Sequence, residues 1–284
     1  MATLKGIDIS HHQDAIDWDK LKSANLDFIL IRAGFGMYEK QVDDCFLSNI
    51  KNAPSLGIPI GIYWYSYATT RAQAEREAEV CLKTIEPYRD RITLPVFFDQ
   101  EYEPGIKAAA KTVRTAMCQA FIGKIQAAGY ESGLYCSYDW AKNMVDISAV
   151  PGHKWVAQYD SKCQYTGADL WAWQYSRKGK VPGISTKVDM DTGYFSLPAA
   201  GNKNGWDKTG NDWRYYEQGT PVKSAWRKIT GKSGTHWYYF GADGVMLTGR
   251  QTIKGKDYYL NESAFRGLPE GALWITDKDG EKQS

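Results

Sequence analysis

Short runs of consecutive apolar residues recur along the first two thirds of the chain, and segments with apolar residues three or four positions apart separate the earlier runs. A short apolar run bounded by turn residues is typical of a buried strand, whereas the wider spacing is typical of an amphipathic helix. The predicted strands are Lys5–Ser10, Phe28–Gly34, Ile58–Ser66, Leu94–Tyr102, Gly133–Tyr138, Lys154–Tyr159, Leu170–Ser176 and Lys187–Phe195. The predicted helices are Asp17–Ala24, Val42–Leu56, Thr70–Ile85 and Lys107–Ala128.

Strands and helices alternate as far as the fifth strand, which predicts parallel strands joined by right-handed crossovers. After Tyr138 the helical pattern thins out, and short polar loops containing glycine separate the last three strands. The fold class predicted is α/β: a closed (β/α)8-like barrel with five β/α units and three helix-poor strands. Closure pairs the first strand with the last, which would make Asp8 and Asp189 neighbours.

A second pattern follows the predicted barrel, which spans residues 1–198. Residues 199–205 are a linker by composition, and residues 206–284 repeat an aromatic doublet at a period of roughly 20 to 24 residues. The doublets are Tyr215-Tyr216, Tyr238-Tyr239 and Tyr258-Tyr259, preceded by Trp206, Trp226 and Arg250. Each unit is typical of a short hairpin around a glycine-rich turn, so this part is predicted to be a small all-β hairpin-repeat domain.

Composition narrows the function classes. The net charge of +2 gives no strong basic field, so nucleic acid is not an expected partner. The chain holds 11 Trp and 19 Tyr, whose flat faces suit sugar rings and ammonium groups, although most such rings in any protein serve packing. The five cysteines lack the close pairing of a metal or redox motif and are predicted to be mostly buried thiols. The four histidines lack metal-ligand spacing, so neither a metal nor a cofactor is expected.

Two acidic residues, Asp99 and Glu101, end the fourth apolar run. Side chains two positions apart on a strand share a face, so both carboxyls should project together at its C-terminal end. Two carboxyls held close push their pKa values apart, which predicts a protonated Glu101 beside an ionised Asp99. A protonated and an ionised carboxyl are the two groups that cleave a glycosidic bond. Cα atoms two residues apart on a strand are separated by roughly 6.5 Å, which allows the short carboxyl spacing of a retaining enzyme. A solvated acidic strand end is the alternative.

Asp8 interrupts the first apolar run, where strand propensity disfavours an aspartate. Its burial there indicates either a hydrogen-bonded structural role or a role in a site. Neither a basic segment followed by an apolar one at the N-terminus nor any span of transmembrane length is present, so membrane insertion is not expected.

A series of motifs at the predicted strands is more specific than any one of them. The motifs are Gly6-Ile7-Asp8-Ile9-Ser10 with His12-Gln13, Arg32-Ala33-Gly34, Gly61-Ile62-Tyr63-Trp64-Tyr65-Ser66, Phe98-Asp99-Gln100-Glu101, Trp173-Gln174-Tyr175 and Val188-Asp189. In this order they resemble the motifs of the glycoside hydrolase family 25 muramidases, over residues 3 to about 197. That family cleaves the β-1,4 bond between N-acetylmuramic acid and N-acetylglucosamine in bacterial peptidoglycan.

The resemblance implies a role for each matching carboxyl. Glu101 is the expected general acid/base and Asp99 its partner, with Asp8 and Asp189 as supporting carboxylates. The side chains predicted to bind the substrate are Tyr63, Tyr65, Tyr135, Gln158 and Trp173. Many family members have Asn two residues beyond the strand-eight Asp, where this chain has Asp191, so the role of Asp191 stays open.

The segment Thr235–Gly249 resembles the cell-wall-binding repeats of choline-binding and glucan-binding proteins. In those repeats, aromatic side chains enclose a quaternary ammonium by cation–π attraction. The resemblance implies choline, or a wall glycan or teichoic acid, as a ligand. The predicted wall contacts are Trp206, Trp213, Trp226, Trp237 and Tyr239. The alternative is that these rings only stack repeat on repeat, and Arg250 stands where a Trp is expected and would repel a cation.

The sequence therefore predicts a modular peptidoglycan hydrolase, an N-acetylmuramidase that retains configuration and is anchored to the bacterial cell wall by its repeats. The N-terminus without a signal peptide favours a phage endolysin, made in the cytoplasm and released through a membrane lesion, over a secreted autolysin. A chitinase-like glycosidase is one alternative, but such enzymes carry a longer run of alternating acids than Phe97 and Phe98 allow. A non-catalytic wall-binding protein is the other, and it would not need the acids Asp8, Asp99, Glu101 and Asp189.

Overall fold

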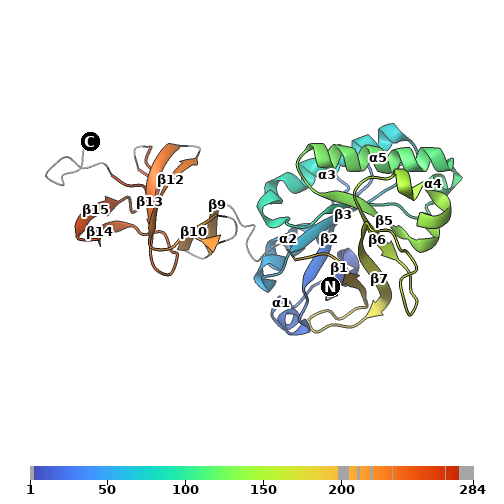
Figure 1. The fold of residues 1–284 in the computed structure, drawn as a ribbon, viewed down its shortest axis with the longest axis horizontal. Helices are drawn as coiled ribbons and strands as arrows, with labels where there is room; N and C mark the ends of the chain where they lie inside the picture. Colours follow the sequence, from blue (N-terminus) through green and yellow to red (C-terminus); the bar gives the residue numbers. More distant parts are fainter. Residues whose placement is uncertain are drawn as a thin grey trace. The chain divides into compact units, whose positions relative to one another are not determined.

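The computed structural model describes residues 3–197, 205–209, 212–217, 220–231, 233–265 and 267–274. Contacts between Cα atoms divide the chain into two compact units, Met1–Leu197 and Pro198–Ser284. All the α-helices in the described part of the chain belong to the first unit, and the second is built from short strands (Figure 1).

The first unit is a closed eight-stranded barrel, as predicted. Its strands follow chain order around the barrel: β1 (Leu4–Ile9), β2 (Phe28–Phe35), β3 (Ile60–Tyr65), β4 (Val96–Asp99), β5 (Ser132–Ser137), β6 (His153–Ala157), β7 (Leu170–Gly179) and β8 (Val188–Gly193). Strands β1 to β7 pair with one another in parallel, whereas β8 is antiparallel to both β7 and β1. Asp8 and Asp189 are register partners, which confirms the predicted closure.

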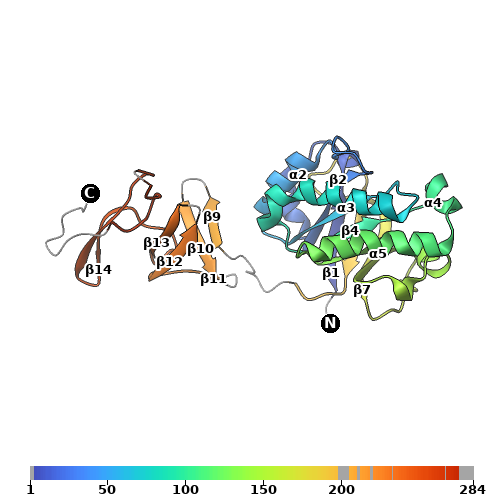
Figure 2. The ribbon, with the colours of Figure 1, turned by 90° about the horizontal axis from the view of Figure 1, so that it is seen from above.

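The helices are shorter than the sequence predicts. They are α1 (Trp18–Leu21), α2 (Phe46–Asn52), α3 (Arg71–Ile85), α4 (Pro104–Ala108) and α5 (Lys111–Ala127). The predicted helix Lys107–Ala128 is broken, because Ala109 and Ala110 are extended and the Arg114 guanidinium donates hydrogen bonds to the carbonyls of Lys107 and Ala109. Helices α3 and α5 pack side by side against the barrel (Figures 1 and 2).

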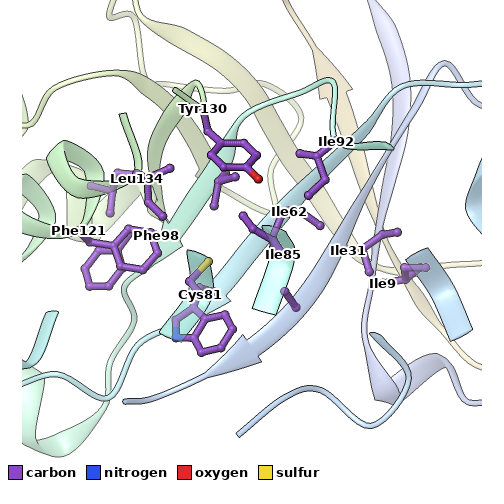
Figure 3. Packing of buried hydrophobic residues seen from close by; sticks show 14 of the residues in the cluster. Ile9, Ile31, Ile62, Cys81, Ile85, Ile92, Phe98, Phe121, Tyr130 and Leu134 are labelled. Atoms are coloured by element: carbon purple, nitrogen blue, oxygen red, sulfur yellow. The ribbon is translucent and has the colours of Figure 1, made fainter. Parts of the chain in front are cut away.

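The barrel has an apolar layer on each side of its strands. Outside, strand residues meet the helices, and Phe98 of β4 stacks on Phe121 of α5 with ring centroids 4.5 Å apart (Figure 3). Three of the five cysteines are buried, among them Cys81 in this outer layer, while Cys45 and Cys163 are partly exposed. The prediction of mostly buried thiols is therefore correct.

The inner layer is an aromatic floor formed by Phe28, Phe97, Tyr135, Trp155 and Trp171. Phe97 lies at its centre, with ring centroids 5.5 Å from Trp155 and 5.1 Å from Trp171. Side chains two apart on a strand share a face, so Asp99 projects from β4 directly above Phe97. Phe28, Phe97 and Trp171 thus fill the barrel below the acids, whereas Tyr135 is the register partner of Asp99 and lies at their level near the mouth.

The second unit contains one small sheet of β9 (Gly205–Thr209), β10 (Asp212–Glu217) and β11 (Thr220–Pro221). Two hairpins follow, β12 (Ala225–Gly231) with β13 (Gly234–Phe240), and β14 (Gly249–Ile253) with β15 (Lys256–Leu260). These are the predicted hairpin repeats. Their core contains Val222, Ile229, Tyr238, Phe240, Met246 and Ala272.

Candidate active site

The sequence predicts a strand as far as Tyr102, but β4 ends at Asp99 and Glu101 lies two residues beyond it. Gln100 explains how the alternation continues past the strand. Its backbone N–H donates to the carbonyl of Tyr135 at 3.1 Å, and its side-chain oxygen accepts from Trp140 Nε1 at 3.0 Å in the helix layer. Because Gln100 is held outward in this way, Asp99 and Glu101 are both directed toward the barrel mouth.

Asp99 is only 3% exposed, and its Oδ1 atom has no hydrogen-bond partner in the described part of the chain. Burial, together with the charge of Glu101, raises the pKa of Asp99 well above its usual range, and Arg32 opposes this only in part. This shift runs against the expectation that Asp99 stays ionised. The physical reason is depth: Asp99 ends the buried strand, whereas the expectation considered only the repulsion between neighbours.

Glu101 is half-buried and is surrounded by other acids. Burial, followed by the charges of Glu103 and Asp189, raises the pKa of Glu101, and a hydrogen bond with Tyr135 opposes the rise. This direction favours the protonated form that a proton donor needs. The charge of Glu101 in turn opposes ionisation of Asp99.

The two supporting acids meet where β1 and β8 close the barrel. Asp8 Oδ2 accepts a hydrogen bond of 2.8 Å from Gln174 Nε2, and burial with the charges of Asp191 and Asp189 raises the pKa of Asp8 well above its usual range. Burial raises the pKa of Asp189 to about 6, although Arg177 lowers it. Because β8 is antiparallel, Asp189 lies near the mouth at the start of the strand and Asp191 lies one step deeper.

Three of the predicted substrate-binding residues accompany the acids. Tyr63 and Tyr135 are buried in the barrel interior, and their pKa values are raised well above the usual range by burial and by the charges of neighbouring acids. Tyr65 donates to Glu103 Oε1 at 2.6 Å, and Trp64 between the two tyrosines faces the helix layer. These tyrosines therefore line the site with hydroxyl groups.

The other two predicted residues, Gln158 and Trp173, lie elsewhere. The Gln158 side chain accepts from the backbone N–H of Gln164 at 2.8 Å, and the Trp173 indole donates to the carbonyl of Gln158 at 2.7 Å. Gln174 faces the interior, so its neighbour Trp173 lies on the opposite face of β7. The contacts of both residues hold the connection between β6 and β7, and their substrate roles stay predictions.

Gln174 is a site residue that the sequence analysis passed over. It is buried, donates to Asp8, and accepts through Oε1 from the hydroxyls of Tyr135 and Tyr159, both at 2.9 Å. Its signal in the sequence is its place in the motif Trp173-Gln174-Tyr175, but only Trp173 of that motif was predicted to bind the substrate. Glu103 was missed as well, although it continues the spacing of two from Asp99 and Glu101.

The predicted wall-binding aromatics fall into two groups. Trp206 and Trp213 pack together with centroids 5.9 Å apart, and Trp206 also contacts Tyr238 at 4.7 Å within the core of the second unit. Trp226 instead joins Tyr239 at 5.2 Å and Tyr258 at 4.9 Å in a half-buried cluster of three rings.

Trp237 is 45% exposed on β13. Arg250 is exposed opposite Tyr259, at the place that Trp226 occupies opposite Tyr239. The third unit therefore has no Trp at that position.

The residues that the structure describes contain no group of three or more His, Cys, Asp or Glu side chains arranged to hold a metal ion. Within the same residues, no helix has the length and apolar character needed to cross a membrane.

The barrel and the repeats each match a known family. Residues 7–184 match "Glycosyl hydrolases family 25", and residues 222–264 match "Choline-binding repeat". Lysozyme M1 of Streptomyces globisporus is 29% identical over 200 residues, which cover 66% of this chain and 67% of that protein.

Solved structures show the same similarity. The modular autolysin LytC of Streptococcus pneumoniae, solved also in complex with a synthetic peptidoglycan ligand, superposes with a TM-score of 0.61 at 26% identity, over 68% of this chain and 47% of that chain. The catalytic domain of an endolysin from a Listeria monocytogenes bacteriophage gives a TM-score of 0.56 at 26% identity, over 67% of this chain and 93% of that chain. This chain thus spans about half of the autolysin and nearly all of the endolysin domain.

Proposed function

Because this chain belongs to family 25 of the glycosyl hydrolases and is a lysozyme-type peptidoglycan hydrolase, we propose that it cleaves the β-1,4 bond between N-acetylmuramic acid and N-acetylglucosamine with net retention. The observation that carries this proposal is the carboxyl pair of Asp99 and Glu101 at the barrel mouth, both with raised pKa values. A raised pKa keeps a proton available near neutral pH for transfer to a leaving oxygen.

In the proposed first step, Glu101 gives its proton to the glycosidic oxygen as the bond from that oxygen to the muramic acid C1 breaks. The carbonyl oxygen of the same sugar's 2-acetamido group attacks C1 and forms an oxazolinium ring. Asp99 orients the acetamido group and stabilises its developing positive charge. This role requires the one proton of the pair to reside on Glu101, the more exposed carboxyl, once the substrate is bound.

In the second step, Glu101 removes a proton from water, and the water oxygen attacks C1 from the face that the leaving group vacated. The acetamido ring reopens and the new reducing end has the β configuration. Asp8 and Asp189 stand beside the pair, and Tyr63, Tyr65 and Tyr135 supply hydroxyls for the sugar rings. The two inversions at C1 account for net retention.

The products of purified cell walls test this function. We expect turbidity to fall, mass analysis to find N-acetylmuramic acid at the new reducing ends, and NMR of freshly cleaved product to show the β anomer first. An initial α anomer would mean inversion through an activated water. N-acetylglucosamine at the reducing ends would instead assign the cleavage to the other glycosidic bond of the polymer.

For the second unit, we propose that residues 206–284 hold the enzyme on the bacterial wall, through choline or a wall glycan or teichoic acid. Support comes from the match to choline-binding repeats and from the three-ring cluster of Trp226, Tyr239 and Tyr258, which lies within the matched range. Rings at such distances present negative faces to a cation. Trp206 and Trp213 contribute packing to the proposed module.

We expect choline to change the tryptophan fluorescence of the full chain with a saturable curve below tens of millimolar, because exposed cation–π contacts contribute only about 0.5–1 kcal/mol each. Trp226→Ala should raise the half-saturating concentration by about two- to fivefold, because it removes one such contact and the ring that touches both Tyr239 and Tyr258. Trp173→Phe, in the barrel, serves as the matched control and should leave the curve unchanged. A flat titration of the unaltered chain would favour a wall glycan as the ligand.

A further inference from the structure

Asp191 is a carboxyl to which neither the fold nor the proposed mechanism has given a role. It is 0% exposed and lies below Asp189 on β8. The Trp155 indole donates to Asp191 Oδ1 at 2.8 Å, whereas Oδ2 is buried without a hydrogen-bond donor among the side chains and backbone groups that the structure describes. Burying a carboxylate oxygen without a hydrogen-bond donor costs free energy. The groups next to Oδ2 should therefore show how this cost is avoided.

The neighbour on β1 is Asp8, whose carboxyl lies within hydrogen-bonding reach of Asp191 and is itself 4% exposed. Asp8 Oδ2 already accepts from Gln174 Nε2. Two ionised carboxylates are acceptors only, and therefore they form no hydrogen bond with each other. A proton placed between them would satisfy Asp191 Oδ2 and remove one of two adjacent negative charges.

The charged groups around Asp8 and Asp191 do not neutralise the two carboxyls, so the shared proton has to do so. Asp189 on β8 and Asp99 at the end of β4 add negative charge. Of the cations near the mouth, Arg32 on β2 binds Asp43 at 2.8 Å and Arg177 on β7 acts on Asp189. The uncharged donors, Trp155 on β6 and Gln174 on β7, each provide one hydrogen bond, and Tyr135 and Tyr159 donate to Gln174.

We propose that Asp8 and Asp191 share one proton and that Asp191 is a positioning residue: its Oδ2, joined to Asp8 through that proton, acts together with Gln174 to fix the orientation of the Asp8 carboxyl at the mouth. Burial raises the pKa of Asp191 to about 8, although the hydrogen bonds from Trp155 and with Asp8 lower it. This value agrees with a proton that the pair holds at neutral pH. The catalytic consequence rests on the proposed function, whereas the shared proton itself does not.

The first experiment measures stability against pH. An acid whose pKa is higher in the folded chain favours folding most at low pH, and the folded state loses this advantage as pH rises from about 3.9, the unfolded value, toward about 8. Asp191→Asn carries no such proton. The unfolding equilibrium constant of the unaltered chain, divided by that of Asp191→Asn, should therefore rise about tenfold per pH unit between about pH 5 and pH 7.

Urea unfolding of the full chain, followed by circular dichroism of the barrel helices, gives these constants. Asp8→Asn should abolish the same pH dependence, and the double variant should add nothing to either single one, because one proton is shared. Asp90→Asn, at an exposed position, is the matched control, and its ratio should stay level. A level ratio for Asp191→Asn would overturn the proposal. If Asp191→Asn does not fold, the Asp8→Asn ratio alone decides in the same way.

The second readout is the turnover number for soluble glycan fragments near neutral pH. Asparagine can keep a hydrogen bond to Asp8 through its amide, whereas leucine fills the same volume with neither a donor nor an acceptor. We expect Asp191→Asn to exceed Asp191→Leu in kcat by at least about tenfold, since Asp8 loses its orientation in the second variant. Equal rates would overturn the positioning role. A chain that releases no glycan fragments would contradict the proposed function, while the unfolding data would still decide the shared proton.

Discussion

Glu101→Gln is expected to lower the rate of peptidoglycan hydrolysis by on the order of 10²-fold or more, because an amide cannot deliver a proton to the leaving oxygen. The loss should appear in kcat with little change in KM, since glutamine keeps the shape of the side chain. Turbidity clearance of purified walls and the turnover of soluble glycan fragments measure both values. Near-normal activity in this variant would remove Glu101 from the mechanism.

The pH profile separates a lost proton donor from a general disturbance. The pKa of Glu101 is raised, so the unaltered enzyme should lose activity as pH rises through that value and the donor becomes ionised. Residual activity in Glu101→Gln should lack this decline. Because glutamine stays neutral, the variant should also avoid the loss of stability that an acid with a raised folded-state pKa suffers above its unfolded pKa of about 4.3. A matching drop in both activity and stability would point to misfolding instead.

Asp99→Asn is expected to impair hydrolysis severely, by about 10²-fold, while making the fold more stable at neutral pH. Asp99 is buried with an unpaired Oδ1, and the raised pKa means that folding becomes less favourable as pH rises above the unfolded value of about 3.9. Asparagine is neutral at every pH and avoids this cost. The same residue should therefore oppose folding and support catalysis, as active-site groups often do.

Parallel measurements of kcat and of urea unfolding at about pH 7 test this pairing of effects. Asp189→Asn is the comparison, since Asp189 is more exposed and its pKa is raised only to about 6. It should lose less activity and gain less stability. An Asp99→Asn protein that is less stable than the unaltered chain would show that Asp99 has hydrogen-bond partners that stabilise its ionised form.

The order of strands and the closure of the barrel were predictable, because continuous apolar runs and their spacing depend on burial over many residues. The ends of the helices and strands were less predictable. The helix break at Ala109 and Ala110 depends on the Arg114 side chain, which contacts carbonyls several positions earlier. No local sequence pattern predicts such a contact. The antiparallel direction of β8 likewise follows from a short connection after β7, whose length alone did not decide between a hairpin and a crossover.

Within the site, the four predicted acids come together because alternation on β1 and β8, and on β4 as Gln100 continues it to Glu101, sends all of them inward. The ionisation of Asp99 could not be predicted, since it depends on depth in the folded barrel more than on the distance to Glu101. Gln174 was missed, and the role of Asp191 was left open, for a similar reason. Their importance arises from partners on other strands, Asp8 and Trp155, and these contacts exist only once the sheet has closed.

The single antiparallel strand also determines where the barrel begins and ends. Strand β8 runs from the mouth back to the opposite rim, where Gly193 is the register partner of Leu4 at the start of β1. The entry and exit of the barrel chain are therefore adjacent, on the rim away from the acids. Neighbouring ends are what circular permutation and domain insertion require. A fusion partner can be attached near either end of the barrel without its attachment point lying beside the mouth, which makes this unit a convenient cassette for exchanging binding modules.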